Sequence, residues 1–354
     1  MTHPNYVPLI EITRGSIVES IHFGAIAVSD NTGNLLATCG DPYTVTYLRS
    51  SAKPFQALPM VEAGGDTTYD LSPSELALIC ASHSGTDEQV EKVRSIQKKV
   101  GVTESDLLCG VHEPYDEETA RALRARGEAP SPNRHNCSGK HTGMLAFARL
   151  GGWPVKNYVE LQHPVQQAIL MTFAEMAGLP PEQVVVGVDG CSAPNFAVPL
   201  ANAARAYANV IDPRNLSAKR AAACQRITRA MTRHPEMVAG PGRFDTRLME
   251  ATGGRILCKS GAEGYLGMAL EPEALGPRTP AVGIAIKIAD GDLTGRALRC
   301  VALEVLQQLG AITPQELEDL VDFCNQPLYN QRRILVGQVQ PHFELTKDER
   351  YFGA

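Results

Sequence analysis

Apolar positions change their spacing twice along the chain, and the changes separate strand-rich ends from a helical middle. Residues 7–48 are rich in β-branched side chains that partly alternate, and a turn at Asp30–Asn34 predicts a hairpin. From Ser50 the apolar residues of FQALPMVEAGG follow a helical period. The strand pattern returns in RILCKSG, GYLGMAL and AVGIAIKIA between residues 255 and 289, and a helix from about 292 to 309 follows.

The middle of the chain carries several helix-start signals. Ser72-Pro73-Ser74-Glu75 and Thr86-Asp87-Glu88-Gln89 have the form of capping boxes, and the loop between their helices contains Ser82-His83-Ser84-Gly85. Further predicted elements are helices near 117–126, 141–149, 160–177, 218–232 and 245–251 and a short buried strand at 184–191. This order predicts an α/β protein with an antiparallel sheet lobe (residues 1–50 and 254–354) and a mostly helical lobe (residues 51–253).

Composition excludes two classes of function. The 354 residues have a net charge of −6, no dense Lys/Arg block and 6% aromatic side chains. A nucleic-acid groove needs a cationic stripe, and a membrane-surface helix needs a basic amphipathic face, so we expect neither partner. No apolar window reaches membrane-spanning length. The nine cysteines are scattered and the first residues lack a secretory pattern, so we expect reduced thiols in a cytoplasmic protein.

Ser50 and Lys53 form a Ser-x-x-Lys pair at a predicted helix start, the nucleophile motif of penicillin-binding proteins and serine β-lactamases. A serine hydroxyl attacks after a base takes its proton, and a lysine one helical turn away is placed to take it. The partial positive charge of the helix N-terminus favours the alkoxide that develops. Lysine accepts a proton only when neutral, so burial or a second cation must lower its pKa.

The surroundings of Ser50 distinguish it from a second Ser-x-x-Lys run at residues 95–98, which lies in a helix of alternating charges and predicts only a solvated face. Ser82 occupies a loop between helices, where this enzyme class carries its Ser-Asp-Asn box. Lys259-Ser260-Gly261 occupies a strand, as the Lys-Thr/Ser-Gly box does. The strand lysine would also supply the cation that lowers the pKa of Lys53. Three elements in this order predict a serine amidohydrolase.

Another group of residues lies around Cys137-Ser138-Gly139-Lys140-His141 and Asp189-Gly190-Cys191. Its Gly-Lys pair does not form a Walker A loop, because a histidine stands where Ser or Thr is needed. Cys137 and Cys191, with His135 or His141, offer ligands for a metal. Two small buried cysteines explain the same residues without a metal, and the residues alone leave both interpretations open.

Several runs together resemble the rhizobial-type (class 3) L-asparaginases over nearly the whole chain. The runs are RGSIVESIH (residues 14–22), LRSSAKP (48–54), CASHSG (80–85), HNCSGKH (135–141) and VDGCSAP (188–194). The resemblance implies a fold similar to serine β-lactamases and glutaminases and the hydrolysis of L-asparagine to L-aspartate and ammonia. It also implies a homodimer.

The resemblance implies roles for particular residues. It pairs two serines with two lysines as catalytic groups, namely Ser50 with Lys53 and Ser82 with Lys259. Lys287, in the middle of an apolar strand, competes with Lys259 for the last role, although its side chain is long enough for the ammonium group to reach the strand end. Arg49, beside the nucleophile, is placed either to pair with the substrate carboxylate or to form a structural salt bridge.

The resemblance also implies a zinc ion with an unusual lysine ligand. Its ligands map to Cys137, Lys140 and Cys191, and Asp189 and His141 match polar residues near the metal and the substrate. Such a zinc would hold the amino-acid end of the substrate or order the site, rather than activate water. The lysine must be neutral to bind, so occupancy should drop as pH falls.

Two alternatives remain at this point. A glutaminase or another small-amide hydrolase would use the same chemistry, and only substrate kinetics separate it from an asparaginase. A non-catalytic protein of the same fold would bind an amino acid without releasing ammonia, but a binding site does not need two mutually destabilising lysines. The Thr-Gly-Gly-Thr run of the threonine-nucleophile asparaginases is absent from the N-terminal part of the sequence.

Overall fold

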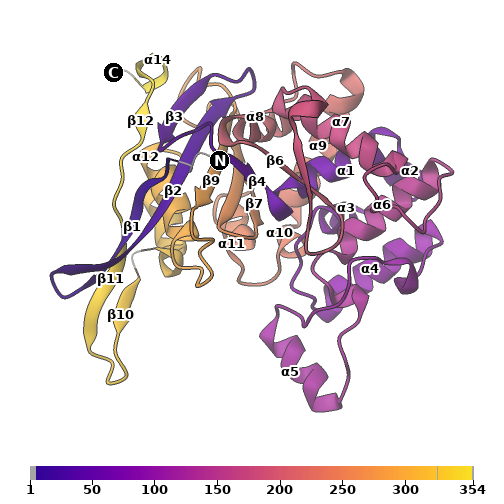
Figure 1. Ribbon diagram of the computed structural model, residues 1–354, viewed down its shortest axis with the longest axis horizontal. Coiled ribbons are helices and arrows are strands. Elements are labelled where there is room, and N and C mark those ends of the chain that lie inside the picture. The colour runs from indigo at the N-terminus through magenta and orange to yellow at the C-terminus, as the bar shows by residue number, and fades with distance from the viewer. Residues whose placement is uncertain (1–4, 325, 353–354) are drawn as a thin grey trace. The chain divides into compact units, whose positions relative to one another are not determined.

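Strands from both ends of the chain meet in one antiparallel sheet (Figure 1). The computed structural model describes residues 5–324 and 326–352. In the sheet β1 lies between β11 and β2, and β2 lies beside β9. The order is β10-β11-β1-β2-β9-β8-β7, with β3 pairing β2 and β12 pairing β3. The strands are β1 (Val7–Arg14), β2 (Ile17–Asp30), β3 (Leu35–Cys39), β7 (Ile256–Gly261), β8 (Tyr265–Leu270), β9 (Val282–Ile288), β10 (Pro327–Tyr329), β11 (Leu335–Pro341) and β12 (Thr346–Lys347). The predicted α/β class and the sheet built from both ends are confirmed.

Helix α8 (Leu200–Ile211) packs against β2, β8 and β9. Two glycines allow this close approach. A Cβ at Gly283 would lie 1.8 Å from the carbonyl oxygen of Ala204, and one at Gly267 would lie 2.0 Å from the ring of Tyr207. Every residue of β9 is buried, as expected of a strand covered on both faces. Helix α8 was not predicted, because alanines stand beside Leu200, Tyr207 and Val210 on its buried face and make the helical apolar period weaker.

The helical middle begins with predicted helices whose caps are confirmed. The Ser72 side chain accepts from the Glu75 N–H and the Thr86 side chain accepts from the Gln89 N–H, and both boxes are reciprocal. The helices are α1 (Lys53–Glu62), α2 (Gly65–Thr68), α3 (Pro73–Ile79), α4 (Asp87–Val100), α5 (Glu117–Arg126), α6 (Ser138–Leu150), α7 (Pro164–Ala177), α9 (Ala218–Arg233), α10 (Pro235–Val238) and α11 (Phe244–Ala251). The remaining short strands are β4 (Val45–Tyr47), β5 (Val185–Val188) and β6 (Pro194–Pro199).

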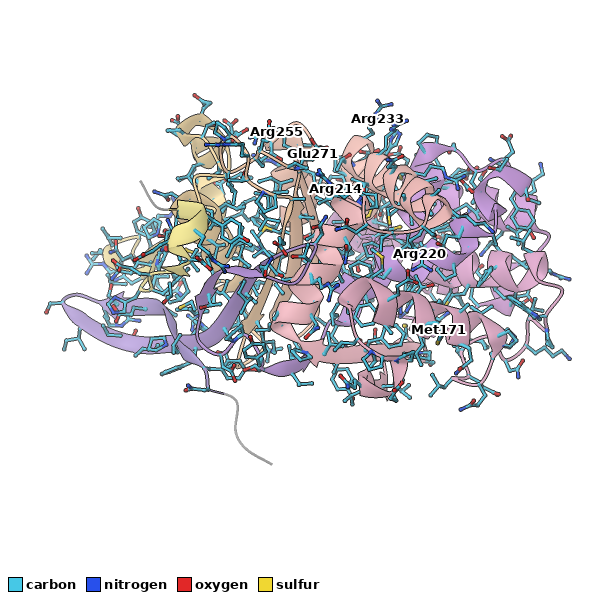
Figure 2. All side chains as sticks on the ribbon, turned by 90° about the horizontal axis from the view of Figure 1, so that it is seen from above. Met171, Arg214, Arg220, Arg233, Arg255 and Glu271 are labelled. Atoms are coloured by element: carbon cyan, nitrogen blue, oxygen red, sulfur yellow. The ribbon has the colours of Figure 1, made fainter. Side chains whose placement is uncertain are left out.

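A buried ionic network ties three of these helices together. Arg220 of α9, labelled in Figure 2, donates to Glu62 of α1 and, over 3.1 Å, to Glu175 of α7. Its side chain is only 11% exposed, so removing either partner would leave a poorly solvated charge. The network therefore fixes the helix that carries Lys53 against its neighbours.

The chain forms two compact units, residues 1–51, 197–212 and 251–354 in one and residues 52–196 and 213–250 in the other. These limits differ from the expected lobes in one respect: the segment that contains α8 belongs with the sheet. No helix among the described residues is long and apolar enough to cross a membrane.

The C-terminal region differs from its prediction in two places. The helix expected from about 292 is α12 (Leu298–Gln308), because the carboxylate of Asp292 accepts the N–H groups of Arg296, Ala297 and Leu298 and so caps a later start. Strands β10–β12 and the short helices α13 (Pro314–Asp319) and α14 (Glu349–Phe352) were not predicted.

Candidate active site

The segment that carries Ser50 is fastened to strand β7. Ser50 lies in a 3-10 turn, Arg49–Ala52, that runs directly into α1. The next residue, Ser51, donates its hydroxyl to the carbonyl oxygen of Lys259 over 2.7 Å, and its own carbonyl accepts from the Tyr207 hydroxyl over 2.8 Å. These buried bonds hold Ser50 beside the strand that carries the proposed second lysine.

Lys259 is fully buried, and its ammonium group donates to the Ser260 carbonyl oxygen over 2.7 Å. A Cβ at Gly261 would lie 2.4 Å from the Leu48 carbonyl oxygen, so this strand end must be glycine to approach the Ser50 segment. Together these contacts hold the Lys-Ser-Gly run beside the turn that contains Ser50.

Lys287, the alternative to Lys259, bonds backbone carbonyl groups near a turn. Its ammonium donates to the carbonyl oxygens of Glu263 and Ile288 at the end of the β7–β8 hairpin. Burial lowers the pKa of Lys287, and the neighbouring carboxylates of Glu263 and Asp290 oppose that shift. These contacts give the mid-strand lysine a structural role.

Arg49 adopts a left-handed backbone with φ of 52°, uncommon for a residue other than glycine. Its guanidinium lies 3.8 Å from the Glu263 carboxylate, and the two side chains are 26% and 58% exposed. Such a pair contributes little stability. Of the two roles expected for Arg49, the salt bridge is present.

The Lys53 ammonium is buried and contacts the other proposed serine. Its Nζ donates to the Ala81 carbonyl oxygen over 2.6 Å and lies 2.9 Å from Ser82 Oγ. The sequence analysis pairs Lys53 with Ser50, one helical turn before it, and pairs Ser82 with Lys259. The contact to Ser82 was not expected, and it makes Lys53 a partner of the second serine as well.

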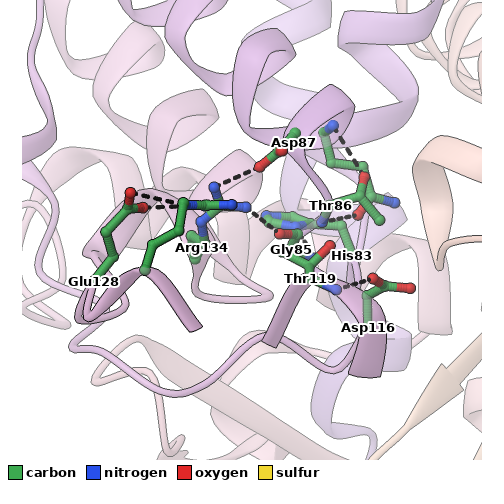
Figure 3. A network of polar contacts seen from close by, with 10 residues as sticks. His83, Gly85, Thr86, Asp87, Asp116, Thr119, Glu128 and Arg134 are labelled. Carbon is green, nitrogen blue, oxygen red and sulfur yellow. Dashed lines mark hydrogen bonds and ion pairs between the residues drawn. The ribbon is translucent and has the colours of Figure 1, made fainter. Parts of the chain in front are cut away.

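The loop that carries Ser82 is held by hydrogen bonds on several sides (Figure 3). The Ser82 N–H donates to the Val238 carbonyl oxygen, and Arg134 donates to the Gly85 carbonyl oxygen. Gly85 has a φ of 78°, and a Cβ there would lie 2.8 Å from the Arg134 carbonyl oxygen. The side chain of Ser84 donates to the Ala239 carbonyl oxygen. Ser82 is therefore presented to Lys53 by a rigid loop.

The proposed metal ligands come together. Cys137 and Cys191 are each 3% exposed, and the Lys140 ammonium donates to Cys191 Sγ over 2.9 Å. The neighbouring Cys191 thiol and the Lys53 and Lys140 ammonium groups hold the pKa of Cys137 well below its usual value. Burial lowers the pKa of Lys140, but the two sulfurs outweigh burial and raise it. The cluster thus brings two sulfur atoms and one amine together in a buried position.

His141 and Asp189 border this cluster. The Tyr158 hydroxyl accepts from the Leu108 N–H and lies 2.7 Å from His141 Nδ1. Burial lowers the pKa of His141 to about 4, against the opposing effect of the Cys191 thiol. Asp189 Oδ1 accepts from the Gly190 N–H in the turn that presents Cys191.

Ser95, the serine of the second Ser-x-x-Lys run, donates its hydroxyl to Glu75 over 2.7 Å. Lys99 donates to the other oxygen of the same carboxylate. This arrangement joins α3 to α4 and has no nucleophile–base pair. Ser95 is half-buried and bonds a buried carboxylate, so it does not lie on the solvated face that was predicted for it.

The sequence analysis missed two tyrosines. Tyr207 orients the Ser50 segment and Tyr158 orients His141, and both side chains are fully buried. Neither tyrosine belongs to a motif, and only the folded chain brings their hydroxyls to the site.

Ser82 Oγ lies beside the buried Lys53 ammonium, and comparison with known families identifies the class of protein to which these residues belong. The sequence matches the family model described as L-asparaginase II over residues 10–341. The chain therefore belongs to the L-asparaginase II family and is an amidohydrolase, which confirms the family resemblance. No curated protein matches the sequence.

Two solved structures are similar in arrangement. A Bacillus glutaminase determined in 4.3 M NaCl is 12% identical, with a TM-score of 0.37, and the alignment covers 81% of this chain and 91% of that one. A probable glutaminase from Bacillus subtilis, complexed with 6-diazo-5-oxo-L-norleucine, is 13% identical, with a TM-score of 0.39 and coverage of 81% and 84%. Similarity at these TM-scores does not bear on the reaction of this chain.

Proposed function

We propose that the protein hydrolyses the side-chain amide of L-asparagine to L-aspartate and ammonia through a serine nucleophile. The observation that carries the proposal is the buried Lys53 ammonium 2.9 Å from Ser82 Oγ, in a chain of the L-asparaginase II family. A buried lysine next to a serine hydroxyl is an arrangement suited to proton transfer.

In the proposed reaction Ser50 Oγ attacks the amide carbon while Lys53 takes the hydroxyl proton. Backbone N–H groups at the start of α1 would stabilise the oxyanion. The C–N bond then breaks, and Lys53 returns the proton through Ser82, so that ammonia leaves and an acyl ester remains on Ser50. Water hydrolyses the ester, giving up its proton along the same route. Lys259 would share in the proton transfer.

The substrate's own charges suggest roles for three further residues. The Arg49 guanidinium, which lies near the Glu263 carboxylate, would pair with the α-carboxylate. Asp189 would pair with the α-ammonium group, and His141 would donate from Nε2. These roles are proposed from the chemistry of asparagine and from the family resemblance.

We further propose that Cys137, Lys140 and Cys191 hold a zinc ion. Among the described residues no three His, Cys, Asp or Glu side chains converge that could hold a metal ion, so the proposed site depends on the Lys140 amine as a ligand. The Lys140 amine lies 2.9 Å from Cys191 Sγ, and two thiols with one amine fit the preference of zinc for sulfur and nitrogen. Zinc would order the site or hold the amino-acid end of the substrate.

A homodimer in the cytoplasm remains part of the proposal. The expectation of a reducing compartment rests on the scattered cysteines of the sequence, which form no compact framework of spacings. The mass in solution, measured by light scattering, tests the dimer: a single species of monomer mass at micromolar concentration would contradict it.

Ammonia release from asparagine and from glutamine tests the function. We expect release from asparagine by wild type and by Ser95→Ala, and loss of at least about a hundredfold in Ser50→Ala and Ser82→Ala. Activity lost in Ser95→Ala but retained in the other two would contradict the proposal, and a higher kcat/KM for glutamine would make the protein a glutaminase. A diazoketone analogue of asparagine should label Ser50, whereas a label on Ser82 would transfer the nucleophile role.

A further inference from the structure

His83 lies between the two serines Ser82 and Ser84, yet it is the environment of its ring that reveals its role. The ring is fully buried. Its Nδ1 accepts from the Gly85 N–H over 3.1 Å, and its Nε2 lies 2.8 Å from Ser138 Oγ. The Ser138 hydroxyl gives its own proton to the Asn133 carbonyl oxygen over 2.9 Å. Both bonds require the neutral tautomer with the proton on Nε2, which donates to Ser138.

The two ends of this ring belong to different parts of the proposed site. The Nδ1 side closes the loop that presents Ser82 to Lys53 (Figure 3). The Nε2 side reaches Ser138, the first residue of α6, directly after Cys137 and two residues before Lys140. A second link runs beside it, because the His83 N–H donates to the Asn136 carbonyl oxygen over 3.2 Å.

A role for His83 in proton transfer does not fit this arrangement. Each ring nitrogen already has a partner, one a backbone N–H and the other a hydroxyl whose proton is committed to a carbonyl. The ring is therefore saturated and holds two elements at a fixed separation.

We propose that His83 is a positioning residue that holds the Ser82 loop against the first turn of α6, so that the Ser82–Lys53 pair and the cysteine–lysine cluster keep one relative geometry. The proposal deepens the proposed function and rests on it for its catalytic consequence. Its structural consequence, the ordering of the first turn of α6, does not depend on any substrate.

The experiment compares two amides at position 83 with a matched histidine elsewhere. The side-chain amide of Asn reaches the position of Nδ1, so His83→Asn keeps the contact with Gly85 and loses the contact with Ser138. The side-chain amide of Gln reaches the position of Nε2, so His83→Gln keeps the contact with Ser138 and loses the contact with Gly85. His163 is the matched control: it is 4% exposed, its Nδ1 accepts from the Val165 N–H and its Nε2 lies 2.9 Å from the Pro154 carbonyl oxygen. It lies at the start of α7, which carries none of the proposed catalytic or metal residues.

We expect His83→Asn to lower kcat for asparagine about tenfold with little change in KM, because the serine–lysine geometry loosens while the substrate contacts remain. His83→Gln should recover most of kcat, and His163→Asn should lower only the melting temperature. All rates are measured at a temperature where each variant is folded by circular dichroism.

A second readout needs no turnover. In the metal-free proteins, the thiols of Cys137 and Cys191 should react with Ellman's reagent several-fold faster in His83→Asn than in His163→Asn, since the loop no longer holds α6. Equal kcat and equal labelling in the two Asn variants would overturn the proposal. Faster labelling in a protein that never releases ammonia would support the positioning role and refute the proposed function separately.

Discussion

Mild acid should destabilise this protein strongly, because the folded chain buries histidines in their neutral form. Burial, together with the nearby Lys53, His135 and His112, lowers the pKa of His83 to about 3. Burial lowers that of His141 to about 4. In the unfolded chain both would titrate near the ordinary value of about 6.5. Between these limits the unfolded chain binds protons that the folded chain does not bind, so stability falls as pH falls.

The magnitude follows from the linkage relation. Each histidine costs about 1.4 kcal/mol for every pH unit below its unfolded pKa, down to its folded pKa. Lowering the pH from 7 to 5 therefore removes roughly 2 kcal/mol for His83 and about 4 kcal/mol for His83 and His141 together. That is a large part of the stability of an ordinary protein.

Urea unfolding at pH 7 and pH 5, followed by circular dichroism, measures the effect. Glutamine does not titrate, so the loss of unfolding free energy between pH 7 and pH 5 that is predicted for His83 and His141 should be about half as large in His83→Gln. This holds whatever the stability of the variant at pH 7. His342→Gln, at a side chain that is 63% exposed, is the control and should behave as wild type. If His83→Gln and wild type lose the same free energy between the two pH values, the histidine reasoning is wrong.

Three further changes test other parts of the structure. Tyr207→Phe removes the donor to the Ser51 carbonyl and should lower the free energy of unfolding in urea by about 1 kcal/mol. It should also lower kcat, and an unchanged kcat would contradict the role given to Tyr207. Gly85→Ala needs a left-handed φ of 78° and places a Cβ 2.8 Å from a backbone oxygen, so it should lower the melting temperature by several degrees; a wild-type melting curve would show that the loop is not rigid. Zinc affinity, titrated against a chelator, should rise with pH as Lys140 loses its proton and should fall at least tenfold in Cys191→Ser; a flat pH profile would argue against an amine ligand.

Local patterns predicted what local physics decides. The Ser-x-x-Lys run at a helix start, the capping box at Ser72 and the strand periods of both ends needed only neighbouring residues, and the structure has them. The helix at residues 200–211 was not predicted, because several of its buried side chains are small alanines that give only a weak apolar pattern.

The arrangement of the site was harder to predict than its members. The proximity of Lys53 to Ser82 depends on how a loop 29 residues later is held by carbonyl oxygens from distant helices. The role of His83 depends on the tautomer, and its two partners, Gly85 and Ser138, come from separate runs of the sequence that only the fold brings together. Motifs in the sequence therefore identify the candidate residues, whereas tertiary packing determines which of them are in contact.

The pairing of β1 with β11 has a consequence for the order of events on the ribosome. Ile10 is opposite Pro341, so the edge of β1 that pairs with β11 has no partner until more than three hundred further residues have been synthesised. Contacts of such separation close slowly. Until then the early hairpin, with Ile10 and Ile12 that are buried in the finished sheet, has an unpaired edge and an uncovered apolar face. A chaperone that binds nascent chains would therefore find its longest-lived site at the N-terminal hairpin, and a chain truncated before residue 335 would retain that exposed edge permanently.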